Sequence, residues 1–179
     1  TLSSKLNLLT VGGIVPHKNQ HYIPEIAKYL ISKGIDFEWN IVGPNRNKRY
    51  VEYIKKDIDS FSLKNHVFIK TDVNHQELEA HYLRADLYVQ LSSEEGFCMT
   101  VLDAIAYNIP VLGTPAGAIP EMLESVNGTI VENNLNTLKP ILSHYITIRN
   151  ELEIDKQQLK NFKSNFTWNN AVTQLIEVY

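Results

Sequence analysis

The sequence predicts an α/β fold in which a doubly wound, parallel sheet of about six strands forms a single domain. Apolar runs of strand length alternate with segments of helical periodicity along the 179 residues. Most of these runs are apolar at consecutive positions, which is typical of strands covered by helices on both faces. Strict alternation of strand and helix favours parallel neighbours joined by right-handed crossovers.

Six apolar runs are expected to form the strands, and a glycine or a short polar turn follows most of them. The third run is short and the sixth is weak. The predicted strands are residues 6–11, 37–42, 67–70, 87–91, 109–112 and 128–131.

Helical periodicity fills the segments between the strands. In residues 19–33 an apolar stripe recurs at helical spacing, and Gly34 follows as a C-terminal cap. Pro24 is compatible with this helix only if the regular part begins near Tyr22, because proline is tolerated in the first turn. The other predicted helices are residues 48–60, 76–83, 98–107, 120–124, 137–149 and 169–178.

Composition excludes several classes of function. Seventeen Lys and Arg stand against 20 Asp and Glu, a net charge of -3, so nucleic-acid binding through bulk positive charge is not expected. The single cysteine, Cys98, excludes an internal disulfide and favours a reducing, cytoplasmic compartment. No run of about 18 uninterrupted apolar residues occurs, so we expect no membrane-spanning helix. The chain begins at Thr1 without methionine, and we interpret it as part of a longer protein.

The loop after the first strand is a candidate anion site, because ligands of doubly wound sheets bind beyond the carboxyl ends of the strands. Gly12 and Gly13 let backbone N–H groups approach a ligand, and Lys18 follows close to a helix N-terminus. The alternative is a surface lysine beside an ordinary turn. Neither the G-x-G-x-x-G spacing nor the Walker pattern is present, which disfavours dinucleotide and P-loop interpretations.

The loop after the fourth strand carries two candidate carboxylates. Glu95 precedes Gly96 at a strand-to-helix turn, and Asp103 lies in the following helix. That helix is apolar nearly all round, so we expect it to be buried and its carboxylate to need a partner such as two vicinal sugar hydroxyls. The alternatives are a capping box from Ser92 to Glu95 and a surface salt bridge or hydrogen bond for Asp103.

No metal site is expected from the sequence. His17 and His21 have a spacing that could face one metal ion on a helix, but no carboxylate or cysteine joins them. We interpret both histidines as solvated.

Taken together, these segments resemble the donor half of GT-B retaining glycosyltransferases of the glycosyltransferase group 1 (family 4) type. The resemblance covers most of the chain and depends on the combination of motifs, since the Lys18 loop alone is not specific. The motifs are Val11-Gly12-x-Ile14-x-Pro16-x-Lys18-Asn19, Ile41-Val42-Gly43, Glu95-Gly96-Phe97, Pro110-Val111, Gly117-x-Ile119-Pro120-Glu121 and Phe166-Thr167-Trp168.

The resemblance implies a Rossmann-like donor-binding domain over residues 1–179, with an N-terminal acceptor domain absent from this chain. It implies transfer of a sugar, as by a hexosyltransferase, from a nucleotide-diphosphate sugar to a glycan or glycolipid acceptor, as in polysaccharide biosynthesis. No metal or other cofactor is implied. The missing half would supply any peripheral membrane contact, and we expect this chain alone to transfer little sugar.

The resemblance also implies roles for individual residues. Lys18 would stabilise the leaving diphosphate and Glu95 would contact the donor sugar, and these two are the catalytic candidates. Asp103 would bind the ribose hydroxyls. The other implied binding residues are Gly12 and Gly13 in the first loop, Gly43, Asp72 and Val73 near the base, and Gly96, Phe97, Cys98, Met99 and Thr100 near the phosphates.

The sequence departs from the family pattern at four positions. Gly13 stands where arginine is usual, Thr71 and Cys98 where glycine is usual, and Asp103 where glutamate is usual. The missing arginine removes one phosphate-binding cation, unless Arg46 or Lys70 compensates. Two alternatives therefore stay open: a catalytically degraded nucleotide-sugar binding or interaction module, and, less favoured, a nucleotide-sugar epimerase.

Overall fold

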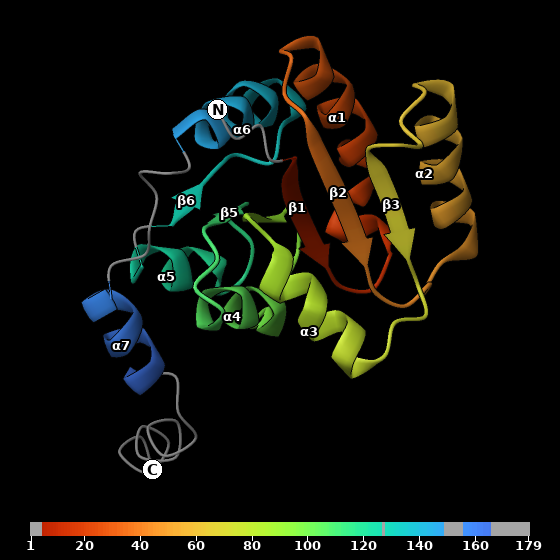
Figure 1. Cartoon of the computed structure of the whole chain (residues 1–179). Helices are drawn as coiled ribbons and strands as arrows, with labels where there is room; N and C mark the ends of the chain where they lie inside the picture. The colour runs from red at the N-terminus through yellow and green to blue at the C-terminus, as the bar shows by residue number, and fades with distance from the viewer. Residues whose placement is uncertain (1–4, 127, 149–155, 166–179) are drawn as a thin grey trace.

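The computed structural model describes residues 5–126, 128–148 and 156–165. Its centre is a six-stranded, all-parallel sheet in the order β3-β2-β1-β4-β5-β6 (Figure 1). This is the order of a doubly wound sheet, in which the chain moves outward in one direction and then restarts from β1 in the other. The strands are β1 Leu6–Val11, β2 Phe37–Val42, β3 Val67–Lys70, β4 Leu87–Gln90, β5 Val111–Gly113 and β6 Thr129–Ile130.

Helices cover both faces of this sheet, as the apolar runs predicted. Helices α1, α2 and α6 pack on one face, and α3, α4 and α5 pack on the other, with α7 against α4 (Figure 1). The α-helices are α1 Ile23–Ser32, α2 Lys48–Ser60, α3 His75–Arg84, α4 Met99–Ala106, α5 Ile119–Glu124, α6 Leu135–Ile148 and α7 Lys156–Asn165. None of the described helices is both long and apolar enough to cross a membrane.

Most predicted elements are confirmed, with differences at their ends. Residues 19–22 do not join helix α1; two short 3-10 helices, η1 Pro16–Lys18 and η2 Gln20–Tyr22, precede it. Pro24 lies in the first turn of α1 and Gly34 follows the helix with φ +72°, as expected. Helix α7 was not predicted, and the predicted helix at 169–178 lies outside the described residues.

The core has two halves because side chains alternate across the strands. Leu8 belongs to the half under α1, α2 and α6, whereas its neighbour Leu9 belongs to the half under α3, α4 and α5. The first half contains Trp39, which is fully buried. Each half of the core is contiguous, so the helices on each face are packed firmly on the sheet. The loops at the carboxyl ends of the strands connect these strands to these helices and are therefore held in place.

One polar group joins three central strands inside the first half of the core. The Thr10 hydroxyl of β1 donates to the Val89 carbonyl of β4 at 2.7 Å and accepts from the Trp39 indole N–H of β2 at 3.1 Å. All three groups are buried, and a buried polar group left without a partner costs about 1–3 kcal/mol. The hydroxyl therefore stabilises the centre of the sheet, directly before the β1 loop.

We expect Thr10→Val to lower the free energy of unfolding by about 1–3 kcal/mol, because it leaves the Trp39 N–H without its acceptor. Urea denaturation measures this change. The matched control is Thr147→Val on the exposed surface of α6, where the hydroxyl bonds only the Ser143 carbonyl and the expected change is within about 0.5 kcal/mol. Equal losses of stability for the two substitutions would show that the hydrogen bonds of the buried Thr10 hydroxyl do not stabilise the fold.

Candidate active site

The loops after β1 and β2 are pressed together at the carboxyl edge of the sheet. Gly12 and Gly43 have φ angles of +151° and +150°. A β-carbon on Gly43 would lie only 2.1 Å from the Gly12 carbonyl oxygen, so no other residue fits there. The Ile14 N–H also donates to the Pro44 carbonyl at 3.0 Å. Gly12 and Gly43 thus allow the contact between the loops, in addition to the ligand approach predicted for them.

Lys18 and Glu95 meet at this edge, although 77 positions separate them in the chain. The Lys18 Nζ lies 2.5 Å from the Glu95 Oε1, and the two side chains are 17% and 7% exposed. The Lys18 stem passes Gly12, where a β-carbon would stand 3.7 Å from its Cε. The structure therefore brings together the two residues expected to be catalytic, in a charge-assisted contact that little solvent reaches.

Neutral donors surround the carboxylate of Glu95. Its Oε1 accepts from the Ser92 hydroxyl at 2.6 Å and from the Gln90 amide at 2.9 Å. The Gln90 Oε1 in turn accepts from the buried Tyr88 hydroxyl at 2.8 Å. Oε2 of Glu95 takes none of the bonds from Lys18, Ser92 or Gln90. The arrangement orients the carboxylate from β4, and the Cys98 thiol also donates to it.

The capping-box interpretation of Ser92 and Glu95 is wrong. Helix α4 begins at Met99 with Cys98 as its N-cap, so Glu95 lies before the helix rather than in its first turn. Cys98 has φ +59°, a left-handed conformation that favours glycine and ends the turn. Because Cys98 carries a side chain, it is a strained residue in the loop.

Burial and hydrogen bonding act in opposite directions on Glu95. Burial raises the pKa of its carboxyl, but hydrogen bonds from Lys18 and Ser92 and the charge of Lys18 outweigh that effect. The pKa of Glu95 therefore lies below its ordinary value, and the residue is ionised at neutral pH. Lys18 and Glu95 accordingly form a true ion pair.

The turn that carries Glu95 rests on the loop after β5. Gly117 has φ +54°, and a β-carbon there would lie 2.3 Å from the Gly96 carbonyl oxygen and 2.4 Å from that of Glu95. The Ala118 N–H donates to the Gly96 carbonyl at 3.0 Å. Gly117, which the sequence motif contained without an assigned role, lets these two loops touch.

The start of α4 is less buried than its composition predicted. Val101, Ala104 and Ile105 face the core, but Phe97 is 47% exposed and Met99 is 58% exposed. The prediction of a helix buried all round is therefore wrong at its N-terminal end. Thr100 lies beside Cys98, with its Oγ1 3.7 Å from the thiol sulfur.

Asp103 is half-buried on α4 and has no hydrogen-bond or ion-pair partner among the described residues. The alternative prediction for Asp103, a surface salt bridge or hydrogen bond, is therefore not met within the described residues. Burial raises the pKa of its carboxyl, and the smaller electrostatic effect of His75 acts in the opposite direction. Asp103 is thus a partly desolvated carboxylate with free hydrogen-bonding capacity.

The residues predicted near the base lie at the same edge but outside the ion-pair cluster. Asp72 and Val73 occupy the loop between β3 and α3, where the Thr71 hydroxyl donates to Asp72 at 3.0 Å and Val73 packs on the core. Gly13 neighbours Arg46 rather than the ion pair, and the Gln20 amide donates to its carbonyl at 3.0 Å.

Sequence reasoning missed three residues that position the pair: Tyr88, Gln90 and Gly117. Gln90 was visible as the one polar residue in the apolar run of β4, which is the signal that could have identified it. His21, expected to be solvated, instead bonds the Tyr50 hydroxyl through Nδ1 at 2.8 Å, and burial lowers its pKa. Among the described residues no cluster of three or more His, Cys, Asp or Glu could hold a metal ion.

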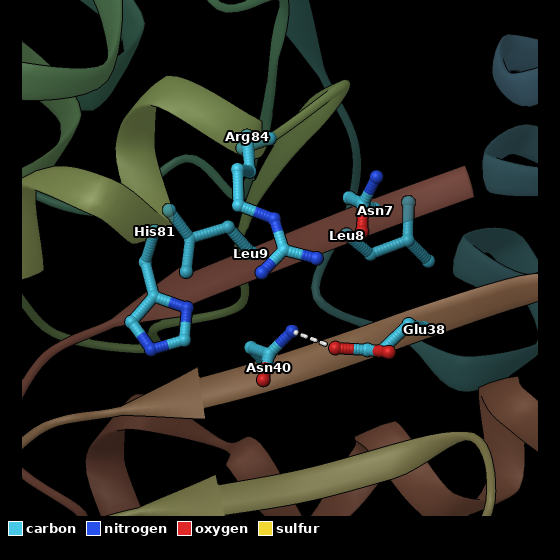
Figure 2. Close-up of a pocket in the computed structure, with 8 residues that line it drawn as sticks. Asn7, Leu8, Leu9, Glu38, Asn40, His81 and Arg84 are labelled. Atoms are coloured by element: carbon cyan, nitrogen blue, oxygen red, sulfur yellow. Dashed lines mark hydrogen bonds between the residues drawn. The ribbon is translucent and has the colours of Figure 1, made fainter. Parts of the chain in front are cut away.

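A hollow lies over the amino-terminal halves of β1 and β2, beside the end of α3 (Figure 2). Figure 2 shows Asn40 donating to Glu38 at 3.0 Å, with His81 and Arg84 reaching over from α3. None of the predicted site residues lines this hollow. The catalytic candidates therefore belong to the opposite edge of the sheet.

Comparison with known proteins shows the family of this chain. A family model described as glycosyl transferases group 1 matches residues 3–141. The chain belongs to this family. An uncharacterized glycosyltransferase of Methanocaldococcus jannaschii is 26% identical over 176 residues, which cover 96% of this chain and 47% of that protein. The chain spans half or less of the length of such full-length relatives.

Solved structures of this kind share the fold. The C-terminal domain of a glycosyl transferase group 1 family protein (LpcC) from Francisella tularensis has a TM-score of 0.78 at 21% identity, covering 91% of this chain and 87% of that one. HepE from Anabaena, solved in complex with UDP-glucose, has a TM-score of 0.82 at 19% identity, covering 98% and 49%. The fold is thus that of the C-terminal domain of a GT-B glycosyltransferase.

We expect Gly117→Ala to destabilise this glycosyltransferase domain by about 1–3 kcal/mol more than Gly34→Ala, because its methyl group meets two backbone oxygens of the Glu95 turn. Gly34 is the matched control, since its φ is +72° and nothing lies within 4 Å of a β-carbon there. Denaturant titration of both variants measures the difference. Equal losses for the two variants would mean that the Gly117 contact does not constrain the turn.

Proposed function

We propose that this chain is the donor-binding half of a retaining glycosyltransferase that moves a sugar from a nucleotide-diphosphate sugar to a glycan or glycolipid. The observation that carries the proposal is the partly buried Lys18–Glu95 pair at the carboxyl edge of the sheet. An ammonium and a carboxylate held side by side suit a ligand that combines a diphosphate with hydroxyl groups. A nucleotide sugar has this combination at the bond that breaks.

Lys18 is proposed to stabilise the negative charge that develops on the departing diphosphate. It is a compact point charge in a site with little solvent, where such stabilisation is strong. Glu95 is proposed to accept hydrogen bonds from donor-sugar hydroxyls through Oε2, since Oε1 already accepts from three protein donors. The intact pair favours this proposal over a degraded donor pocket.

The turn before α4 and the helix itself are proposed to bind the rest of the nucleotide. Backbone N–H groups at the start of α4, with the Thr100 hydroxyl, suit phosphate oxygens. Asp103 has the free carboxylate oxygens that two ribose hydroxyls require. Gly43, Asp72 and Val73 would face the base. UDP-glucose in the similarly folded HepE supports a nucleotide sugar as the ligand class.

Transfer is proposed to need an acceptor half that this chain does not contain. A site built between two halves is completed only when they close and exclude water. Calorimetric titration of this chain with UDP and GDP, each with and without a sugar, tests the binding step by itself. Absence of binding for every nucleotide at millimolar concentration would contradict the proposal.

We expect Glu95→Gln to separate the sugar contribution from the phosphate contribution. The variant leaves Lys18 without its counter-charge, so affinity for UDP or GDP should be unchanged or higher. It also replaces a carboxylate acceptor by a neutral amide, so the gain in affinity from the attached sugar should fall about tenfold, the cost of one charge-assisted hydrogen bond. Calorimetry with the nucleotide and its sugar conjugate measures both effects.

Glu94→Gln is the matched control, because Glu94 is the exposed neighbour of Glu95 and has no ion pair among the described residues. It should leave both affinities unchanged. A loss of nucleotide affinity in Glu95→Gln, with the sugar gain intact, would show that Glu95 supports the phosphate region rather than the sugar.

A further inference from the structure

The Lys18–Glu95 pair has no net positive charge to balance the negative charge of the proposed diphosphate ligand. Lys18 is already neutralised by Glu95 at 2.5 Å, so the pair adds no net charge. A nucleoside diphosphate carries more than one negative charge, and binding it at a neutral pair would leave that charge uncompensated. A further cation at the same edge is required if the site is to attract the diphosphate.

Arg46 lies where such a cation is needed. Its Cγ is 3.2 Å from the point at which a β-carbon on Gly13 would stand, so its stem occupies the space beside Gly13. The Lys18 Nζ is 3.8 Å from the corresponding point on Gly12. Two consecutive residues of the β1 loop therefore have one cationic side chain each beside them, from different segments of the chain.

The backbone around Arg46 is held on both sides. Pro44 accepts the 3.0 Å hydrogen bond from the Ile14 N–H, which ties the β2 loop to the β1 loop. Asn47 caps α2 by accepting from the Tyr50 N–H at 3.0 Å. Arg46 stands between these two anchors, so its Cα is positioned while its guanidinium remains exposed.

Arg46 has no ion-pair partner among the described residues. Its charge is thus available, unlike that of Lys18. Lys70, the other basic residue weighed from the sequence, is at the end of β3 with its Nζ 5.7 Å over the Phe68 ring. The geometry distinguishes the two, because only Arg46 is shown in contact with the Gly12–Gly13 segment.

We propose that Arg46 binds the diphosphate of the nucleotide donor alongside Lys18, from the β2 loop, in space that the absent side chain of Gly13 leaves open. This inference rests on the proposed donor-binding function. A guanidinium can donate two parallel hydrogen bonds to a phosphate, which suits an exposed group that must select an anion by geometry as well as charge. The Arg46 side chain thus occupies space that a side chain at position 13 would otherwise fill.

The test compares Arg46→Ala with Arg84→Ala by calorimetry with UDP, GDP and the corresponding nucleosides. Both variants remove one exposed arginine, but Arg84 lines the hollow at the amino-terminal end of the strands (Figure 2). Arg46→Ala should weaken diphosphate binding about tenfold and leave nucleoside binding unchanged, and Arg46→Lys should have a smaller effect. Arg84→Ala should change diphosphate affinity less than about twofold.

A rescue variant guards against a merely structural effect of Arg46→Ala. In Gly13→Arg/Arg46→Ala the new arginine enters the space that Arg46 vacates, and Gly13 is not among the residues with a positive φ. Diphosphate affinity should recover to within about threefold of the unmodified chain. Recovery would show that a cation at this place, rather than the Arg46 backbone or stem, is what the ligand requires.

The outcomes separate this inference from the function on which it rests. If the unmodified chain binds a nucleotide diphosphate and Arg46→Ala binds it equally well, the role of Arg46 is refuted and the proposed function stands. If Arg46→Ala weakens nucleosides and diphosphates alike, Arg46 contacts no phosphate and the inference also fails. If the unmodified chain binds none of the nucleotides, both proposals are overturned.

Discussion

The contact between the Lys18 ammonium and the Glu95 carboxylate is the constraint on which the rest of the site depends. Two charges removed from most of their water are stable only when they meet in good geometry and their remaining hydrogen-bonding capacity is used. The β1 loop and the turn before α4 must therefore hold a fixed separation, and besides the pairing of β1 with β4 the Ser93 N–H donates to the His17 carbonyl at 2.8 Å. Ser92 and Gln90 donate hydrogen bonds to the Glu95 carboxylate from the β4 side, and the Tyr88 hydroxyl orients Gln90 from inside the core.

Close backbone contacts supply the stiffness that this pair requires. Gly43 meets Gly12, and Gly117 meets the carbonyls of Glu95 and Gly96, at separations that exclude a β-carbon. The four loops at this edge thus meet in two pairs through their backbones, the β1 loop with the β2 loop and the turn before α4 with the β5 loop, so substitutions at these glycines act on the site through its backbone. Cys98 stores strain at the end of the same turn, a conformation that persists because its surroundings determine it.

The distribution of charge separates two tasks at this edge. The Lys18–Glu95 pair is internally neutral and oriented, and we propose that it recognises a sugar attached to a phosphate. Under the proposed function, attraction of the diphosphate would fall to groups whose charge is not already used, and Arg46 beside Gly13 is the group that we propose for it. Asp103, half-buried and without a protein partner in the described chain, has a comparable unused capacity for hydroxyl groups.

The sequence by itself determined the fold class, because alternating strand and helix periodicity and consecutively apolar strands leave few arrangements other than a doubly wound sheet. It also determined which loops carry Lys18, Glu95 and Asp103, since those loops follow predicted strands. The predicted helix over 98–107 matches α4 to within one residue at each end, whereas the alternative in which Ser92 caps it fails, because the left-handed Cys98 precedes the helix and leaves Glu95 outside its first turn. Only the tertiary structure decided that Lys18 pairs with Glu95 and that Arg46 lies beside Gly13. Those contacts join segments far apart in the chain, and their distances depend on how the loops pack rather than on any local periodicity.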